Sequence, residues 1–395
     1  MTGTYERSTV AGEEVSAFLP AALPPQEPAL ELGPLENRLR AAERSLSNLE
    51  LAGEMVPSLD WFIYAFVRKE AVVSSQIEGT QATLVDLLAF ESEVTAAAKD
   101  PDVEEVCHYL DALNYARAEL RSPDGLPMSM RLLNETHARL MRGVRGGDQQ
   151  PGQVRRSQNW IGGSRPGNAA YVPPPPHALR ELLSAFERYI HTDDSLPPIV
   201  KAGLLHVQFE TIHPYLDGNG RIGRLLVTLL LEHWKLLRQP LLYLSLFFKR
   251  HRTEYYDRLN AVRSRGDWEG WIDFFLDGVA TIADEAVASA RDLFTLVNED
   301  RGRALGQAEN SVASIRLFEQ LPRRPIVTVP SAMEALATTR PTAGRAIELL
   351  EAAGVLVERT GKKRDRSWAY QRYLDVLRVG TELESPGRRR GEASR

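Results

Sequence analysis

Apolar residues recur every three to four positions through most of the chain, which is the spacing of one face of an α-helix. This pattern predicts helices over residues 35–51, 59–77, 84–97, 102–120, 128–143, 177–191, 198–212, 225–234 and 268–297. Strict alternation of apolar and polar residues, which is typical of strands, is scarce before residue 300. The pattern therefore predicts a mainly α fold.

The helix over residues 225–234 (LLVTLLLEHW) is apolar nearly all round, and glycines precede it. Residues 213–224 read HPYLDGNGRIGR, so Gly218 and Gly220 lie at the start of a buried helix. Unpaired N–H groups and the positive end of the helix dipole bind anions at such a position. Glycine also lets the backbone approach phosphate oxygens closely. The segment therefore predicts a phosphate-binding site.

Charged side chains in the same segment fit phosphoanhydride chemistry. His213 supplies a base that titrates near neutral pH, and Asp217 supplies an oxygen ligand suited to Mg²⁺. Arg221 and Arg224 are three apart, so both can reach one polyphosphate. His213 precedes Pro214, which predicts an extended backbone at His213. This set favours a bound magnesium nucleoside triphosphate.

Zinc is the alternative for His213 and Asp217, with His206 as a further ligand. The proline after His213 and the Gly-Asn-Gly that follows Asp217 favour phosphate and Mg²⁺ instead. His206 lies in an apolar helical segment, LLHVQF, so we expect it to make a hydrogen bond within the core.

The segment resembles the signature of the Fic/DOC family, H-P-F-x-D/E-G-N-G-R-x-x-R, with Tyr215 in place of the usual Phe. A tyrosine can anchor this loop if its hydroxyl finds a partner. The resemblance implies His213 as general base and Asp217 as Mg²⁺ ligand, with Arg224 clamping the γ-phosphate. It assigns ATP binding to Gly218, Asn219, Gly220, Arg221, Ile222, Gly223 and Arg224. The implied reaction transfers AMP from ATP to a Ser, Thr or Tyr hydroxyl of a target protein, which can be the chain itself.

A second segment, SSQIEGT, resembles the inhibitory motif S/T-x-x-x-E-G/N of the same family. It ends the predicted helix 59–77, and Gly79 is a natural stop. Ser74 and Glu78 are four apart and share a helical face. In the family the glutamate pairs with the last arginine of the signature, here Arg224, and blocks the γ-phosphate position. The resemblance thus implies an inhibitory helix over residues 59–79, with a helix-terminal surface charge as the alternative interpretation of Glu78.

Residues 158–163 and 171–176 flank a turn at 164–168, a pattern typical of a β-hairpin. By resemblance this hairpin is the flap that aligns the target by backbone pairing. Ile161, Gly162, Gly163 and Ser164 would then touch the nucleotide. A plain surface hairpin is the alternative. The resemblance also implies that Tyr255 or Tyr256 stacks on the adenine.

The C-terminal part differs in charge. Residues 301–395 contain 18 Lys+Arg and 11 Asp+Glu, whereas the whole chain has a net charge of −5. Helices at 312–320, 331–337 and 341–353 and short strands at 325–328, 355–359 and 367–370 resemble a winged helix-turn-helix with a basic tip at 361–366. Arg340 and Arg345 would suit phosphate contacts with DNA. Such modules also bind protein or brace a fold, so the partner stays open.

The other bulk properties set limits. The chain has 395 residues and one cysteine, Cys107, which suits a reducing cytoplasm. We expect no membrane span and no signal peptide, because no apolar run is long enough and the N-terminus lacks a basic start. Residues 18–34 are proline-rich and predict an extended strap.

The sequence predicts four regions: an N-terminal helical region over 1–110, a Fic core over 111–300, a winged helix over 301–378 and a disordered basic tail over 379–395. It predicts an autoinhibited protein adenylyltransferase that uses ATP and Mg²⁺. Removal of AMP, and nucleotide sensing by a DNA-bound regulator, are the alternatives. Some family members transfer UMP, phosphocholine or phosphate, and retention of Arg224 favours AMP. Members often dimerise, which leaves a homodimer open.

Overall fold

The computed structural model describes residues 2–55, 59–92, 100–143, 150–306, 311–361 and 364–383. It is 63% helix, which confirms the mainly α prediction. The chain divides into two compact units, Met1–Glu50 with His108–Asp284 and Leu51–Cys107 with Glu285–Arg395. All three boundaries between these units fall within long helices, and the four regions expected from the sequence stay a prediction. No helix in the described ranges is both long and apolar enough to cross a membrane.

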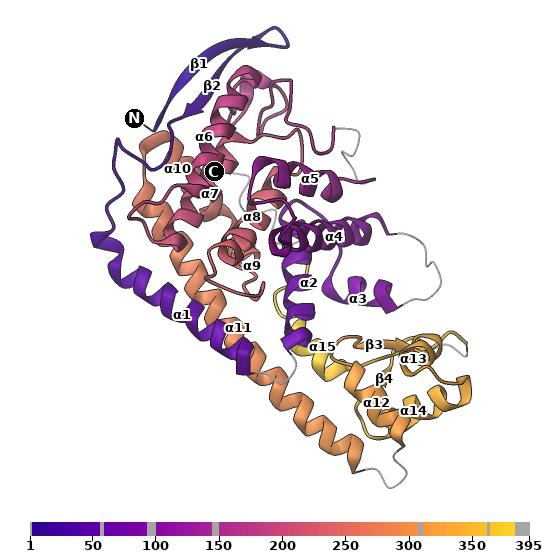
Figure 1. Ribbon diagram of the computed structural model, residues 1–395. Helices are drawn as coiled ribbons and strands as arrows, with labels where there is room; N and C mark the ends of the chain where they lie inside the picture. The colour runs from indigo at the N-terminus through magenta and orange to yellow at the C-terminus, as the bar shows by residue number, and fades with distance from the viewer. Residues whose placement is uncertain are drawn as a thin grey trace, which may run out of the picture. The chain divides into compact units, whose positions relative to one another are not determined.

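The first unit contains most of the helices (Figure 1). Its elements are β1 (Gly3–Val10), β2 (Glu13–Pro20), α1 (Glu36–Met55), α4 (Pro101–Arg121), α5 (Met130–Leu140), α6 (Leu179–His191), α7 (Pro198–Ile212), α8 (Asn219–His233), α9 (Ser245–Arg250), α10 (Arg252–Arg265) and α11 (Trp268–Leu305). Helices α1, α4 and α11 continue across the unit boundary. The predicted helices are present with ends shifted by up to eight residues, and α9 and α10 are additions to them. The end predicted for the helix over 84–97 lies outside the described residues.

The core of this unit is built around α7. Every α7 residue after Pro198 is buried, as expected of a helix that is apolar nearly all round. Helix α8 packs against it, and most α8 residues from Asn219 to Leu231 are buried as well. The junction between these two helices is the segment 213–218, so the predicted phosphate loop starts and ends on rigid elements.

An N-terminal β-hairpin was not predicted. Strands β1 and β2 pair antiparallel from Gly3↔Pro20 to Val10↔Glu13. Their two-residue turn, Ala11 and Gly12, has φ values of 51° and 84°, the positive-φ geometry that matches the twist of paired strands. The proline-rich segment after Pro20 contains an isolated β-bridge between Gln26 and Ala29 and a short 3₁₀ turn, Gly33–Leu35. Phe18 to Pro20, the first part of the predicted strap, belong to β2 instead.

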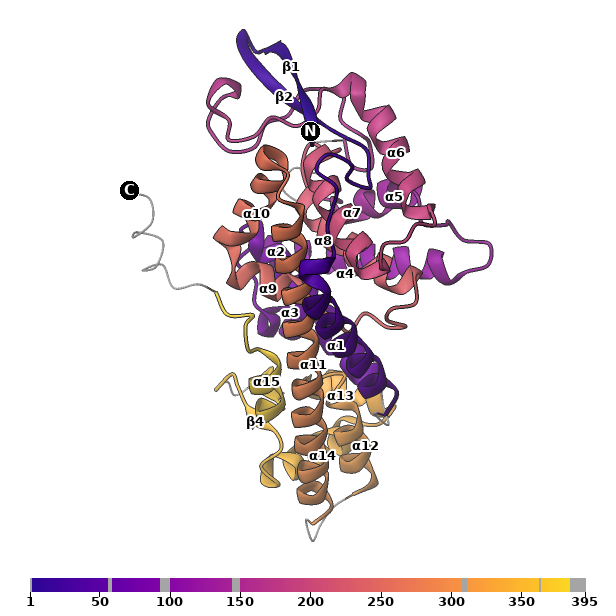
Figure 2. The same ribbon diagram turned by 90° about the vertical axis from the view of Figure 1, so that its left-hand side faces the viewer.

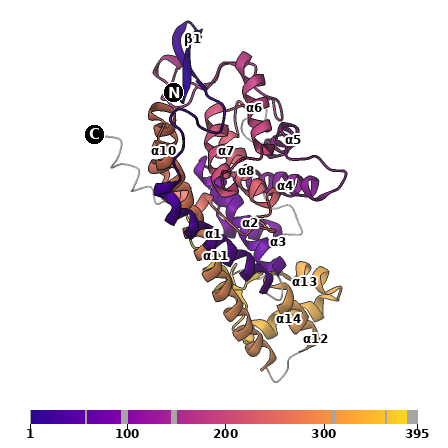
Figure 3. The same cartoon turned by 60° about the vertical axis from the view of Figure 1, so that its left-hand side comes forward.

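The second unit contains α2 (Leu59–Ile77), α3 (Leu84–Ser92), α12 (Val312–Gln320), β3 (Ile326–Thr328), α13 (Val329–Leu336), α14 (Arg340–Ala352), β4 (Val357–Glu358), β5 (Ser367–Ala369) and α15 (Gln371–Leu377). Helices α12, α13 and α14 pack together (Figure 3), and the three short strands form an antiparallel sheet in the order β3-β5-β4. This element order agrees with the predicted one. The winged-helix assignment itself stays a prediction, and Lys362, Lys363 and most of the predicted basic tail lie outside the described residues.

Candidate active site

His213 ends α7 in the left-handed conformation. Its φ and ψ are 50° and 63°, and its backbone N–H donates to the Phe209 carbonyl at 2.9 Å. The extended backbone predicted at this position is therefore wrong. Helices commonly end with a left-handed residue, and Pro214 prevents α7 from continuing. The imidazole accordingly leaves the chain at the point where helix changes to loop.

The loop carbonyls are held from outside by protein donors. Arg155 donates from Nε to the His213 carbonyl at 2.9 Å and from its backbone N–H to the Pro214 carbonyl at 2.9 Å. Asn159 Nδ2 donates to the Leu216 carbonyl at 3.2 Å. The Arg155 side chain is 2% exposed, and burial lowers its pKa to about 10, which leaves the guanidinium charged at neutral pH.

Tyr215 anchors the loop as predicted. Its side chain is fully buried, and its hydroxyl donates to Asn134 Oδ1 at 2.8 Å. The ring stacks on His137 with a centroid separation of 3.8 Å and an interplanar angle of 6°. The replacement of the family's phenylalanine therefore adds a satisfied hydrogen bond to the core packing.

His137 fixes the end of the same loop. Its Nδ1 accepts from the Gly152 backbone N–H at 2.8 Å, so Nε2 carries the proton that it donates to the Asp217 carbonyl at 2.9 Å. Burial lowers the pKa of His137 to about 4, which keeps the ring neutral at physiological pH. Sequence reasoning missed Asn134, His137, Arg155 and Asn159 because all four act from other segments of the chain.

Helix α8 begins directly after Gly218, which is the N-cap with φ 77°. Asn219, its first residue, is 2% exposed and closes the loop: its Oδ1 accepts from the Tyr215 N–H and its Nδ2 donates to the Tyr215 carbonyl, both at 2.8 Å. The Asn219 amide is thus bound to the loop backbone. We therefore expect Asn219 to act on nucleotide binding by holding the shape of the loop. The helix starts six residues before the predicted position, so the N-terminal N–H groups belong to the Asn219–Arg221 turn.

Two buried guanidiniums follow on α8. Arg221 and Arg224 are each 3% exposed. Arg221 Nη2 contacts Met141 Sδ at 3.4 Å and lies 3.9 Å from Asp217 Oδ1. Two cations within the first two turns of α8 make this part of the molecule strongly attractive to anions.

Asp217 is the one carboxylate of the loop and its side chain is 48% exposed. Its Oδ1 accepts from the Gly218 N–H at 2.6 Å, which aims the group alongside the helix N-terminus. Among the described residues, no three His, Cys, Asp or Glu side chains come together in a group that could hold a metal ion. A single exposed carboxylate fits Mg²⁺, which keeps several waters and takes its other ligands from substrate phosphates.

Ile222 and Gly223 face the protein interior. Ile222 is fully buried. A Cβ on Gly223 would lie 2.2 Å from Glu210 Oε1 and 3.4 Å from the Phe209 ring of α7. These two residues therefore serve the α7–α8 contact, and the part in ATP binding that the resemblance implies for them stays a prediction.

Gly223→Ala should lower the thermal stability of the chain, because the added methyl would displace the carboxylate of Glu210, a buried residue of α7. Overpacking of this kind costs roughly 1–3 kcal/mol. Thermal denaturation followed by circular dichroism measures the change. Gly344→Ala is the control, since nothing lies within 4 Å of a Cβ at that helical glycine; an equal or smaller loss in Gly223→Ala would contradict the packing role.

Tyr255 and His206 belong to the core. Tyr255 is 1% exposed, stacks on Phe248, and shares a 2.8 Å hydrogen bond with His206 Nε2. His206 Nδ1 donates to the Gly223 carbonyl at 2.9 Å, as expected of a core histidine. The burial of Tyr255 argues against the predicted adenine stacking by this residue. Tyr256 is 43% exposed and is the remaining candidate.

The predicted flap is a loop closed by one bridge. Ile161 and Tyr171 exchange both backbone hydrogen bonds, at 2.8 and 3.1 Å, and no longer strand forms. Residues 173–176 are all proline and have no N–H to extend the ladder. Gly162 and Gly163 have φ values of 69° and 77°, and Ser164 Oγ accepts from Asn168 Nδ2 at 3.3 Å.

The N-terminal hairpin holds this flap from outside (Figures 1 and 2). Glu13 Oε2 accepts from Arg165 Nη1 at 3.0 Å and from the Gly167 N–H at 2.9 Å. The Phe18 N–H donates to the Val172 carbonyl at 3.0 Å. Val15 and Ala17 pack with Val172 in a small apolar cluster that also includes Trp160. The β1–β2 hairpin therefore fixes the flap at its turn and at its returning segment.

The predicted inhibitory helix is present in the second unit as α2. Its apolar side is buried and includes Phe62, Phe66, Val73 and Ile77. Ser74 is fully buried. Glu78 is exposed in the turn that follows the helix, and Gly79 has φ 107°. The stop at Gly79 is confirmed, and Glu78 lies one residue past the last helical turn.

Comparison with known proteins agrees with these features. A family model described as "Fic/DOC family N-terminal" matches residues 37–118, and one described as "Fic/DOC family" matches residues 127–231. The chain belongs to the Fic/DOC family. The first match contains α2 with Ser74 and Glu78, and the second contains the flap, the 213–218 loop and most of α8.

Two relatives that carry a functional name are similar to this chain at 28–29% identity. The chain is 29% identical over 242 residues to a "Protein adenylyltransferase Fic" of Culex quinquefasciatus, covering 59% of this chain and 45% of that protein. It is 28% identical over 308 residues to the protein of the same name in Drosophila mojavensis, covering 72% and 58%. The chain thus spans about half the length of these relatives.

Two solved structures share the fold. A Fic family protein from Desulfovibrio desulfuricans G20 matches with a TM-score of 0.57 and 20% identity, over 87% of this chain and 97% of that one. A Fic domain containing signaling protein from Bacteroides thetaiotaomicron matches with a TM-score of 0.51 and 18% identity, over 64% and 98%.

Proposed function

We propose that the chain is a protein adenylyltransferase that transfers AMP from ATP to a hydroxyl side chain of a target protein. One observation carries the proposal. The carbonyls of residues 213–217 all accept hydrogen bonds from protein donors, beside a helix N-terminus and two buried arginines. With its carbonyls committed, this loop presents backbone N–H groups and two guanidiniums to an anion, beside the Asp217 carboxylate that we propose as the Mg²⁺ ligand.

Each residue of the site has its own role in the proposed reaction. His213 takes the proton of the target hydroxyl, and the oxygen of that hydroxyl attacks the α-phosphorus of ATP. A new P–O bond forms, the bond between the α-phosphorus and the bridging oxygen breaks, and pyrophosphate leaves. Arg221 and Arg224 neutralise the β- and γ-phosphates, and Asp217 would hold Mg²⁺, whose charge further stabilises the leaving pyrophosphate.

The experiment that tests this reaction compares two labels. The full chain is incubated with Mg²⁺ and with ATP labelled at the α- or the γ-phosphate, in the presence of a cell lysate. Protein-bound label from the α-position alone is expected. Label from the γ-position would indicate phosphate transfer, and label from neither position with the Glu78→Gly variant would count against the proposal.

Autoinhibition is the second part of the proposal. Glu78 would pair with Arg224 and compete with the γ-phosphate, because a carboxylate and a guanidinium form a bidentate pair of matching geometry. The family motif and the exposed position of Glu78 after α2 support this role. A carboxylate so placed can also activate water, so removal of AMP belongs to the same proposal.

The flap should depend on Glu13. We expect Glu13→Ala to lower kcat/KM for a protein acceptor by about tenfold while the KM for ATP changes little, because a misplaced acceptor affects transfer more than nucleotide binding. Steady-state labelling at varied ATP and varied acceptor measures both constants. Glu14→Ala, in the same hairpin and without a bond to the flap, is the control; an equal loss there would show that the hairpin acts only through general stability.

Regulation of transcription is a second candidate, favoured by the excess of basic residues after Arg301. If α13 and α14 form a helix-turn-helix, DNA binding should weaken steeply as salt rises. A gel-shift titration with promoter DNA, compared with a chain ending at Ala304, measures this. Absence of a shift by the full chain at low salt would remove the candidate.

A further inference from the structure

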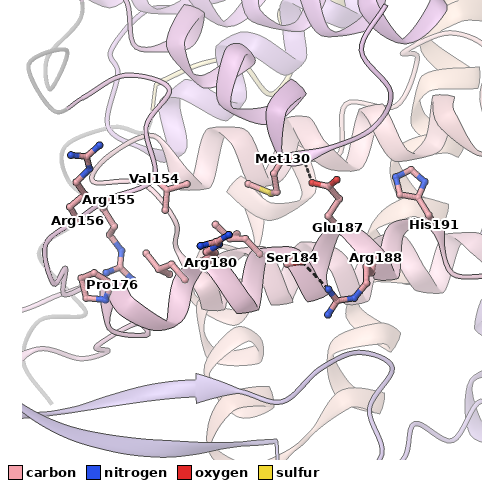
Figure 4. Close-up of a pocket in the computed structure, with 12 residues that line it drawn as sticks. Met130, Val154, Arg155, Arg156, Pro176, Arg180, Ser184, Glu187, Arg188 and His191 are labelled. Atoms are coloured by element: carbon pink, nitrogen blue, oxygen red, sulfur yellow. Dashed lines mark hydrogen bonds between the residues drawn. The ribbon is translucent and has the colours of Figure 1, made fainter.

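A groove of about 710 Å³ runs along α6, and none of residues 213–218 lines it. Its floor is apolar and includes Leu179 and Leu183, which are 1% and 6% exposed. Figure 4 shows Arg180, Ser184 and Arg188 following one another along α6, with Met130 and Val154 opposite. The spacing of four residues places the three α6 side chains on one face of the helix.

The charge of this groove is opposite to that of the whole chain. Arg156, Arg180 and Arg188 line it and are all exposed. Neither Arg156 nor Arg180 has a carboxylate partner among the described residues, and Arg188 Nη1 donates to Ser184 Oγ at 2.8 Å. The net charge of the chain is −5, so this cluster of cations is a local exception.

The groove has a single carboxylate, and it is already engaged. Glu187 Oε2 accepts from the Met130 backbone N–H at 2.8 Å, at the start of α5. His191 shares a hydrogen bond of 2.7 Å with the Met128 carbonyl. The polar groups at this end of the groove therefore hold α5 to α6, and the arginines are left to meet a ligand.

The groove also lies at the base of the flap. Arg155 and Arg156 precede the flap residues, and Pro176 follows them, and all three line the groove. The Arg155 guanidinium is the group that binds the His213 carbonyl. A segment bound in the groove would thus continue toward the part of the molecule that the proposed function assigns to the acceptor.

We propose that this groove, defined by Arg156, Arg180, Arg188, Leu179 and Leu183, docks an acidic segment of the target protein that carries an apolar side chain. The inference rests on the proposed function, because it names the class of substrate. Carboxylates would pair with the three guanidiniums, and an apolar side chain would lie against Met130 and Val154, which line the groove above the two leucines and are half-buried. The apolar floor favours a peptide over a nucleic acid backbone, which offers phosphates without apolar side chains.

Fluorescence anisotropy with the full chain and no ATP tests the docking directly. The probes are two labelled peptides of equal length, one of glutamate and leucine and one of lysine and leucine. The acidic peptide should bind, and its affinity should fall as salt rises, because exposed charges are screened. Arg180→Glu with Arg188→Glu should weaken it by about tenfold or more, since like charges would replace two attractive pairs.

The control changes net charge by the same amount elsewhere. Arg40→Glu with Arg44→Glu alters two exposed arginines of α1 and should leave peptide affinity unchanged. Arg180→Gln with Arg188→Gln, which removes charge without reversing it, serves if the reversal variant does not fold by circular dichroism. Equal binding of both peptides, an equal loss in the α1 control, or full competition by a DNA oligonucleotide would each overturn the inference.

The same variants separate this inference from the proposed function. Self-labelling by α-labelled ATP should persist in Arg180→Glu/Arg188→Glu, while labelling of a serine peptide with acidic flanks should fall relative to one with basic flanks. Peptide binding without any labelling would contradict the transferase and leave docking intact. Labelling without any preference for acidic flanks would contradict docking alone.

Discussion

Replacing Glu78 with glycine should raise labelling of protein by α-labelled ATP about 10- to 100-fold, because charge-assisted hydrogen bonds contribute roughly 1.5–3 kcal/mol and the competing pair would be lost. The variant removes the carboxylate that we propose to pair with Arg224. Glu78 follows α2 in an exposed turn, so glycine there should leave the helix and the melting temperature nearly unchanged. Labelling at saturating ATP, with ATP affinity measured by calorimetry, gives the two quantities needed.

Two further substitutions sharpen this test. Glu78→Gln keeps the size of the side chain and loses its charge, so it should activate nearly as well as glycine. Glu78→Asp keeps the charge on a shorter stem and should activate less. If glycine and glutamine leave labelling at the wild-type level while ATP still binds, the inhibitory role of Glu78 is refuted.

Replacing His213 should abolish labelling while ATP binding persists. General base catalysis typically contributes about 10²- to 10⁴-fold, and no other base is proposed for the acceptor hydroxyl. The effect is best measured in the Glu78→Gly background, where the starting rate is highest. Isothermal calorimetry with ATP and Mg²⁺ then shows whether the phosphate site remains intact.

The backbone conformation at His213 determines which substitution removes the base with the smaller loss of stability. With φ at 50°, alanine would be strained there by about 1–2 kcal/mol, whereas asparagine visits this region more readily. His213→Asn should therefore keep the loop and lose the base, and His213→Ala should lose the base with some loss of stability. Labelling retained by the asparagine variant would remove His213 from the proposed mechanism.

The local features of the site could be predicted from sequence because they depend on near neighbours. The common reach of Arg221 and Arg224 and the place of Gly218 at the start of α8 depend on helix geometry alone. The stop of α2 at Gly79 is equally local, since a left-handed residue after a helix favours glycine. These predictions needed no knowledge of distant segments.

Predictions about side-chain environment were less successful, since they depend on which elements pack together. Tyr255 and Tyr256 are adjacent in sequence, yet one is buried against His206 and the other is exposed. Asn219 was expected to meet the nucleotide, and its amide is used by the loop. The flap strands were shortened to one bridge because prolines supply no donors, a feature that the sequence did contain.

The sequence by itself determined the mainly α fold, the glycine-containing loop between two helices with the spacing of Arg221 and Arg224, and the end of α2, because each depends on residues within one or two helical turns. Only the tertiary structure decided what holds that loop and the flap. Arg155, His137 and Asn134 reach the loop from separate segments, and Glu13 reaches the flap from a hairpin more than a hundred positions earlier. Hydrogen bonds of this kind are formed by side chains that are far apart along the chain, so no periodicity or spacing records them.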